Sequence, residues 1–276
     1  MSHRSKPPGY TLGSMLLSCL FMLVLIGTLA HAQADQKQPP NPAPAVECST
    51  TSDLAKAPDG PDSTCIVQEI IRRGEVAAIP TLKEKFARST DVLTKEHVAS
   101  ALVRLGDRND VYWDFLEKQA TAAIDSGIPD IWGYDSQGKL IPGPSPEFTA
   151  WAQAHNLSPA AAEERARLFY GAVLILATTR DPRGTPLLRQ ALSARNYMIQ
   201  TAAAEGLAAI QDTESIPLII DAVKKAPAEA GAVIARSLVF FDDPEAQAAV
   251  DKYVPRDSAK VLREDRAQRG TKTPWD

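Results

Sequence analysis

Residues with reactive side chains are scarce in this sequence. Its 276 residues include four histidines and three cysteines, and aromatic residues make up 6%. The sequence contains no His-Glu-x-x-His run, no Gly-x-Ser-x-Gly elbow and no phosphate-binding Gly-rich loop. The motifs of zinc peptidases, serine hydrolases and nucleotide-binding enzymes are therefore missing. We predict a protein that is not an enzyme and that has no cofactor and no metal site.

Positive charge is also in short supply. Thirty lysines and arginines stand against 34 aspartates and glutamates, which gives a formal net charge of −4. Nucleic-acid-binding proteins need a basic face, and anionic lipid surfaces attract basic segments. The acidic balance argues against both, so we expect a protein or peptide partner instead.

The only long apolar run stands at the start of the sequence. Arg4 and Lys6 precede it, no acid occurs before it, and small residues stand at Ala30 and Ala32. This order is typical of a secretory signal peptide over residues 1–32, cut after Ala32. We expect export to the periplasm or the exterior, with no membrane insertion after cleavage. An uncleaved helix that anchors the protein in the membrane is the alternative, because the run approaches spanning length.

The next two segments contain little apolar material. Residues 33–47 are rich in Pro, Gln and Ala, which predicts a disordered tether. Cys48 and Cys65 bound the following segment, 48–65, and they are the only cysteines left after cleavage. In an exported protein such a pair favours one disulfide, and no Cys-x-x-Cys spacing points to redox chemistry instead.

A repeated phrase organises the rest of the sequence. ILATTRD, GLAAIQD and SLVFFDD end at Asp181, Asp212 and Asp243, which are 31 residues apart. Residues nine, five and two positions before each aspartate are apolar except for Thr179, and this spacing places them on one face of a helix. Glu75 and Asp107 occupy the same place in two earlier copies, and we call these five residues the marker acids.

The marker acids are predicted to separate two helices. Aspartate is a good helix N-cap because its carboxylate accepts hydrogen bonds from free backbone N–H groups of the first turn. Pro182 and Pro244 follow two of the markers, at the first helical position where proline is tolerated. The pattern predicts an all-α fold, an α-solenoid of about five antiparallel helix pairs. We assign it to residues 66–256, followed by a charged tail over 257–276.

Three segments of the sequence resemble the HEAT-like repeat family, particularly the phycobilisome-lyase-type repeats. They are AIPTLKEKF…VASALVRLGD, GTPLLRQAL…TAAAEGLAAIQD and SIPLIIDAV…GAVIARSLVFFDD. The resemblance implies a HEAT-like solenoid whose second helices line a concave side. It says little about function, because repeat positions encode stacking rather than chemistry. The di-iron hydroxylases of this fold depend on His-Glu dipeptides, which do not recur in this sequence.

One repeat carries an insertion over residues 126–157. Its first part is dense in Gly and Pro and contains Trp132 and Tyr134. We expect a long loop without regular structure, followed by a helix that Ser145 caps and Pro146 begins. Long loops are often functional, so a binding or lid role stays open beside simple packing of the aromatic rings.

We predict a non-catalytic exported scaffold that binds a protein or peptide on the concave face and the insertion. An accessory lyase-like or hydrolase enzyme with the insertion as a lid, and a structural subunit of a larger envelope assembly, are the alternatives. The candidate partner-binding residues are polar positions near the ends of the second helices and two aromatic residues of the insertion. They are Arg104, Arg180, Glu205, Arg236, Trp132 and Tyr134.

Overall fold

The computed structural model describes residues 51–269. The predicted signal peptide, the tether and Cys48 lie outside these residues. Among residues 51–269, no helix is long and apolar enough to cross a membrane. The described part of the protein is mostly helical, and its helices pack in adjacent pairs as in a HEAT-type α-solenoid.

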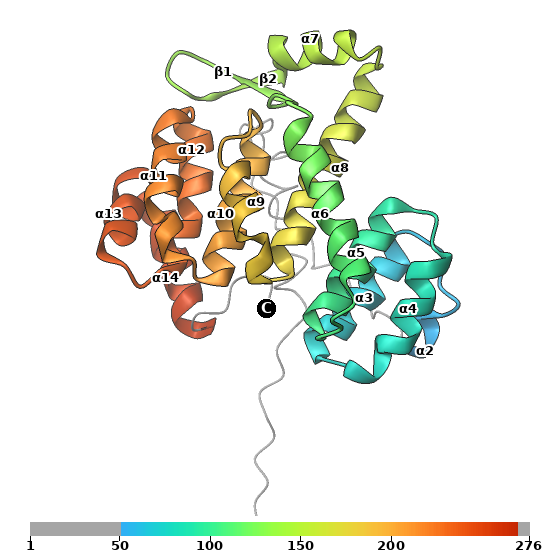
Figure 1. Ribbon diagram of the computed structural model, residues 1–276. Helices are drawn as coiled ribbons and strands as arrows, with labels where there is room; N and C mark the ends of the chain where they lie inside the picture. The colour runs from blue at the N-terminus through green and yellow to red at the C-terminus, as the bar shows by residue number, and fades with distance from the viewer. Residues whose placement is uncertain (1–50, 270–276) are drawn as a thin grey trace, which may run out of the picture. The chain divides into compact units, whose positions relative to one another are not determined.

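Each pair has a first and a second helix, and the pairs follow one another in sequence order (Figure 1). A short helix and a longer one precede the pairs, α2 (Thr51–Leu54) and α3 (Pro61–Arg73). The first helices are α4 (Ile79–Arg88), α6 (Asp110–Asp125), α9 (Thr185–Ala191), α11 (Ile216–Lys225) and α13 (Pro244–Tyr253). The second helices are α5 (Val92–Arg104), α8 (Pro159–Thr178), α10 (Tyr197–Ile210), α12 (Ala228–Ala235) and α14 (Arg256–Arg269).

The second helices contact one another in sequence along the array. α3 packs on α5, α5 on α8, α8 on α10 and α10 on α12. The 3₁₀ helix η4 (Arg236–Phe240) continues α12 and contacts α14. Because each helix contacts mainly its neighbours, residues at the same repeat position come to lie beside one another.

Three copies share a turn that the sequence did not predict. After the marker acids Glu75, Asp181 and Asp212, a 3₁₀ turn precedes the helix. These turns are η1 (Val76–Ala78), η2 (Pro182–Gly184) and η3 (Thr213–Ser215). The recurring proline five residues after each of these marker acids then has a structural reason. The prolines occupy the first turn of α4, α9 and α11, where a backbone N–H is not needed.

The capping role predicted for the aspartates Asp181, Asp212 and Asp243 is confirmed in two copies and wrong in one. Asp181 accepts from the backbone N–H of Arg183, and Asp243 accepts from those of Glu245 and Ala246. Asp212 makes no such bond. Its carboxylate accepts instead from the Arg189 guanidinium and the Ser215 hydroxyl.

The marker acids also join neighbouring copies. Lys83 Nζ lies 2.7 Å from Asp107 Oδ2, and Arg189 Nη2 lies 2.7 Å from Asp212 Oδ1. Both basic residues stand eight positions after the marker acid of the preceding copy. The same repeat position therefore supplies an ionic contact to the next copy at two junctions.

The residue before a marker acid takes a left-handed backbone conformation. Gly74 and Gly106 do so in the first two copies, and Arg180 and Gln211 do so later, with φ of 56° and 61°. This conformation closes the preceding helix, because the Asp107 and Asp212 amides donate to carbonyls five residues earlier, at 2.9 and 3.0 Å. Only glycine adopts it without strain.

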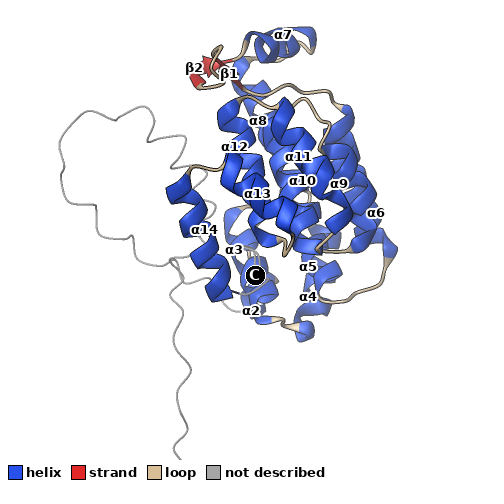
Figure 2. Cartoon of the chain, turned by 90° about the vertical axis from the view of Figure 1, so that its left-hand side faces the viewer, coloured by secondary structure: helices blue, strands red, loops and turns tan. Residues whose placement is uncertain are grey.

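The insertion is not the loop without regular structure that we expected. It contains an antiparallel hairpin of two strands, β1 (Trp132–Tyr134) and β2 (Leu140–Pro144). These are the only strands among residues 51–269 (Figure 2). Gly138 makes the tight turn with φ of 75°, and the Asp135 carboxylate accepts from two backbone N–H groups across it. The helix expected after it, α7 (Pro146–Ala154), is present, and the Ser145 hydroxyl caps it.

Candidate functional site

Polar residues recur at the same repeat positions on the second helices; Ser100 is buried, and Arg104, Thr178, Glu205 and Arg236 are half-buried. On α5 and α8 the Ser100 and Thr178 hydroxyls lie 3.2 Å apart, which shows that these positions meet across the helix boundary. Arg104 lies one turn after Ser100 and is half-buried. We call this surface the repeat face and define it by the residues seven and three positions before the marker acids from α5 to η4. These are Ser100, Arg104, Leu174, Thr178, Glu205, Ala209, Arg236 and Phe240.

Glu205 and Arg236 bring groups of opposite charge together on the last two helices of this face. They stand 31 residues apart at equivalent positions on α10 and at the start of η4. Both are half-buried. Burial raises the pKa of the Glu205 carboxyl to about 7, and the nearby Arg236 charge offsets part of that rise. Burial also lowers the pKa of Arg236, while Glu205 opposes that shift.

Arg180 lies beside the repeat face, at the end of α8. It is half-buried and carries the left-handed backbone described above. The two arginines Arg104 and Arg180 end adjacent second helices, α5 and α8, which are in contact. The structure therefore places all four charged candidates on one layer of helices.

The two aromatic candidates lie at the hairpin. Trp132 and Tyr134 both belong to β1 and are half-buried. The Tyr134 ring meets the Tyr197 ring edge-on, with centroids 5.7 Å apart. Burial raises the pKa of the Tyr134 hydroxyl. Tyr197 begins α10 and stands two turns before Glu205 on the same side of the helix. The tyrosine pair thus borders the repeat face.

Specific polar contacts attach the hairpin to α10 and α12. Asp130 is buried, and its carboxylate accepts from the Trp132 and Tyr197 amides at 3.1 Å each. Asn196 donates to the Pro129 carbonyl at 3.1 Å. At the other end, the Glu229 carboxylate accepts from the Leu140 amide at 2.8 Å.

The turn of the hairpin sits against the start of α12. The Glu229 amide donates to the Gly138 carbonyl at 3.0 Å. A Cβ atom on Gly138 would lie 2.3 Å from the Ala228 nitrogen, so only glycine fits there. These contacts show a packing role for the insertion, which the sequence left open beside a binding or lid role.

The sequence offered no signal for Asp130, Asn196 or Glu229, because they act on residues that are distant in sequence. The ionic partners Lys83 and Arg189 did have a signal, their common position eight residues after a marker acid. His97 is half-buried on α5, and burial lowers its pKa to about 4. Its neighbour Glu96 is buried, and burial raises the pKa of that carboxyl to about 8, with a further rise from the Asp91 charge.

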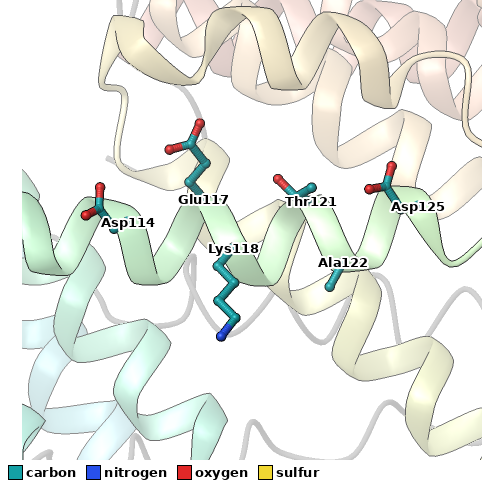
Figure 3. Close-up of a pocket in the computed structure, with 6 residues that line it drawn as sticks. All are labelled: Asp114, Glu117, Lys118, Thr121, Ala122 and Asp125. Carbon is teal, nitrogen blue, oxygen red and sulfur yellow. The ribbon is translucent and has the colours of Figure 1, made fainter.

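A shallow hollow lies along the outer side of α6 (Figure 3). All of the residues that line it come from this one helix. Asp114, Glu117, Thr121 and Asp125 point to one side of the helix, and Lys118 and Ala122 point to the other. Because these side chains do not converge, the hollow offers no binding geometry. Within residues 51–269, no group of three His, Cys, Asp or Glu residues is placed to hold a metal ion.

Comparison with known proteins agrees with this architecture. The family model of HEAT repeats matches residues 157–233, from the start of α8 into α12. No curated protein and no solved structure matches the sequence. The match supports HEAT repeats in general and carries no evidence for the phycobilisome-lyase subtype. HEAT repeats are typically non-catalytic and serve as protein-interaction scaffolds.

Proposed function

We propose that this protein is an exported, non-catalytic scaffold that binds a partner protein or peptide along the repeat face. The observation that carries the proposal is the alignment of polar groups on contacting second helices, with Glu205 and Arg236 on the last two of them. A surface built on packed helices is ordered before the partner arrives, which reduces the entropy that association costs. In this proposal Trp132 and Tyr134 border the binding surface.

Site-specific photo-crosslinking in cells tests this proposal. A photoreactive amino acid replaces Ala209, which is half-buried on the repeat face, and Ala232, one turn before Arg236. The matched control replaces Ala122 on the outer side of α6, an alanine of the other helix layer. We expect one defined protein adduct from the two repeat-face positions and none from Ala122. Adducts only at Ala122, or equal adducts at all three positions, would contradict the proposal.

Export has its own measurement. The intact mass of the purified protein should lack residues 1–32, and a free-thiol assay should find Cys48 and Cys65 joined. The disulfide stays a prediction, because Cys48 lies outside the described residues. A full-length mass with the N-terminal residues still present would favour the anchored alternative instead.

A further inference from the structure

The Glu205 and Arg236 side chains leave hydrogen-bonding capacity unused. Arg236 Nε is buried and has no acceptor within the described part of the protein. No residue from 51 to 269 donates a hydrogen bond to the Glu205 carboxylate, which Arg236 reaches only by a longer-range charge interaction. A buried charged group with an unused hydrogen bond is costly, and this cost falls on Arg236. A bound acceptor would recover it, and a donor on the same bound group would give Glu205 a hydrogen bond.

The residues one turn from the pair have small side chains. Ala209 follows Glu205 on α10 and Ala232 precedes Arg236 on α12, and both are half-buried. Small residues let a backbone approach closely, whereas long side chains would hold it away.

One acid beside one base matches a peptide unit better than a charged side chain. Above the Glu205 pKa of about 7 the two charges have opposite sign, so the pair then has no net preference for an acidic or a basic partner. In an extended segment, the N–H and the C=O of one residue point to the same side, as they do in a sheet ladder. A carboxylate accepts from such an N–H, and a guanidinium donates to such a C=O.

We propose that the partner binds as an extended segment whose backbone N–H donates to Glu205 and whose backbone carbonyl oxygen accepts from Arg236. This inference rests on the proposed scaffold function and names the partner chemistry at its centre. Because backbone groups are common to all residues, the contact fixes the position of the segment and leaves its sequence to be read elsewhere. Tyr197 stands two turns before Glu205 on α10 and packs on Tyr134 of β1, so this ring pair is placed to contact the side chains of the segment.

A displayed library of random peptides, selected on the full-length protein, supplies the probe. Each amide of the tightest peptide is then N-methylated in turn, which removes one backbone N–H at a time. We expect one N-methyl position to weaken binding to the wild type about tenfold or more, since a hydrogen bond to a charged group is lost. The same N-methyl group should have little effect on Glu205→Ala, because that variant has no acceptor to lose.

Two further variants keep the test specific. Glu117→Ala on the outer side of α6 is the matched control and should bind every peptide as the wild type does. Glu205→Gln retains an acceptor oxygen and should keep part of the dependence on that amide. Comparison of unfolding midpoints excludes variants that have lost their fold.

Several results would overturn the inference. They are peptides that bind Glu205→Ala as tightly as the wild type, an N-methyl effect equal in both proteins, and a library that yields no binder. Each of these leaves the scaffold proposal standing if crosslinks still form at Ala209. Absence of those crosslinks would refute the scaffold proposal and with it the assignment of the partner, even if the selected peptides still bind at Glu205.

Discussion

The interface between α8 and α10 and the attachment of the hairpin hold the same part of the molecule in different ways. At the helix interface small apolar residues meet closely. A Cβ atom on Gly206 would lie 2.5 Å from the Ala177 Cβ. The hairpin is held instead by a few hydrogen bonds, one ring pair and the close approach of Gly138 to Ala228. The stability of the helix array should therefore depend on side-chain volume at the helix interfaces. The attachment of the hairpin should depend instead on individual hydrogen bonds and close contacts.

The largest expected effect comes from adding one methyl group to the helix interface. Gly206→Ala should lower the free energy of unfolding by about 2–3 kcal/mol, because overpacking forces the helices apart. Gly171→Ala on α8 is the matched control, because the new methyl group would make only an ordinary van der Waals contact, 4.0 Å from the Leu93 side chain. It should raise the free energy of unfolding by about 0.5–1 kcal/mol through helix propensity. Urea denaturation followed by circular dichroism measures both. Effects of the same sign would refute the volume argument.

The second prediction concerns the buried carboxyl of Glu96 on α5, in the helix array. Glu96 is 2% exposed, and its pKa is raised to about 8 by burial and then by Asp91. In the unfolded state the carboxyl ionises near its ordinary pKa of 4.5. As pH rises from there to about 8, the unfolded state releases a proton that the folded state keeps, so stability falls.

Glu96→Gln removes this penalty. The variant should be less stable than the wild type below pH 4.5, where the wild-type carboxyl is also neutral and the amide costs more to bury, and it should be more stable above pH 8. The shift sets an upper limit of ~5 kcal/mol, and we expect about 2 kcal/mol because the buried amide keeps part of the desolvation cost. Thermal unfolding across this pH range measures the difference. A difference that is constant with pH would show that Glu96 does not titrate as described.

The third prediction tests whether the hairpin can be detached by itself. Gly138→Ala should break the contact with Ala228 and expose the Glu229 amide, which donates to Gly138. Gly143→Ala is the control, because its φ of 92° gives backbone strain without a clash. We expect amide hydrogen exchange at Leu140 and Glu229 to become faster only in Gly138→Ala. The free energy of local opening should fall by about 1–3 kcal/mol. Loss of protection throughout α10 would contradict independent attachment.

The smallest expected effect concerns the left-handed residue before a marker acid. Gln211→Gly should change the free energy of unfolding by less than about 0.5 kcal/mol. It relieves about 1 kcal/mol of left-handed strain but loses the side-chain bonds to the Ala208 and Phe240 carbonyls. Gln211→Ala keeps the strain and loses the bonds, so it should cost about 1–2 kcal/mol. Equal effects of the two variants in urea denaturation would refute this balance.

The repeats were predictable because their signal is local. The apolar spacing before Asp181, Asp212 and Asp243 fixes a helix face, and the caps at Asp181 and Asp243 follow from residues within one turn. The Asp212 exception was not predictable in this way. The Asp212 carboxylate forms an ion pair with Arg189 instead, and that contact depends on how two copies stack.

The hairpin could not be predicted for a different reason. β1 and β2 contain Gly133, Pro142, Gly143 and Pro144, residues that usually weaken strands. Their order comes from docking on Glu229, 89 residues from Leu140. For the repeat face, the repeat register identified Glu205 and Arg236, but their missing hydrogen-bond partners are visible only in three dimensions.

The pair of hydrogen bonds that joins Gly138 and Leu140 to Glu229 also changes how the molecule would respond to force. An array of repeats pulled at its ends yields one unit at a time, because each unit holds only the next. Here the hairpin follows α6 and is fastened to α10 and α12, so tension on any of these helices is shared among all three. Under load, the copies before α6 should peel away singly, and the braced copies should give way together in one larger step.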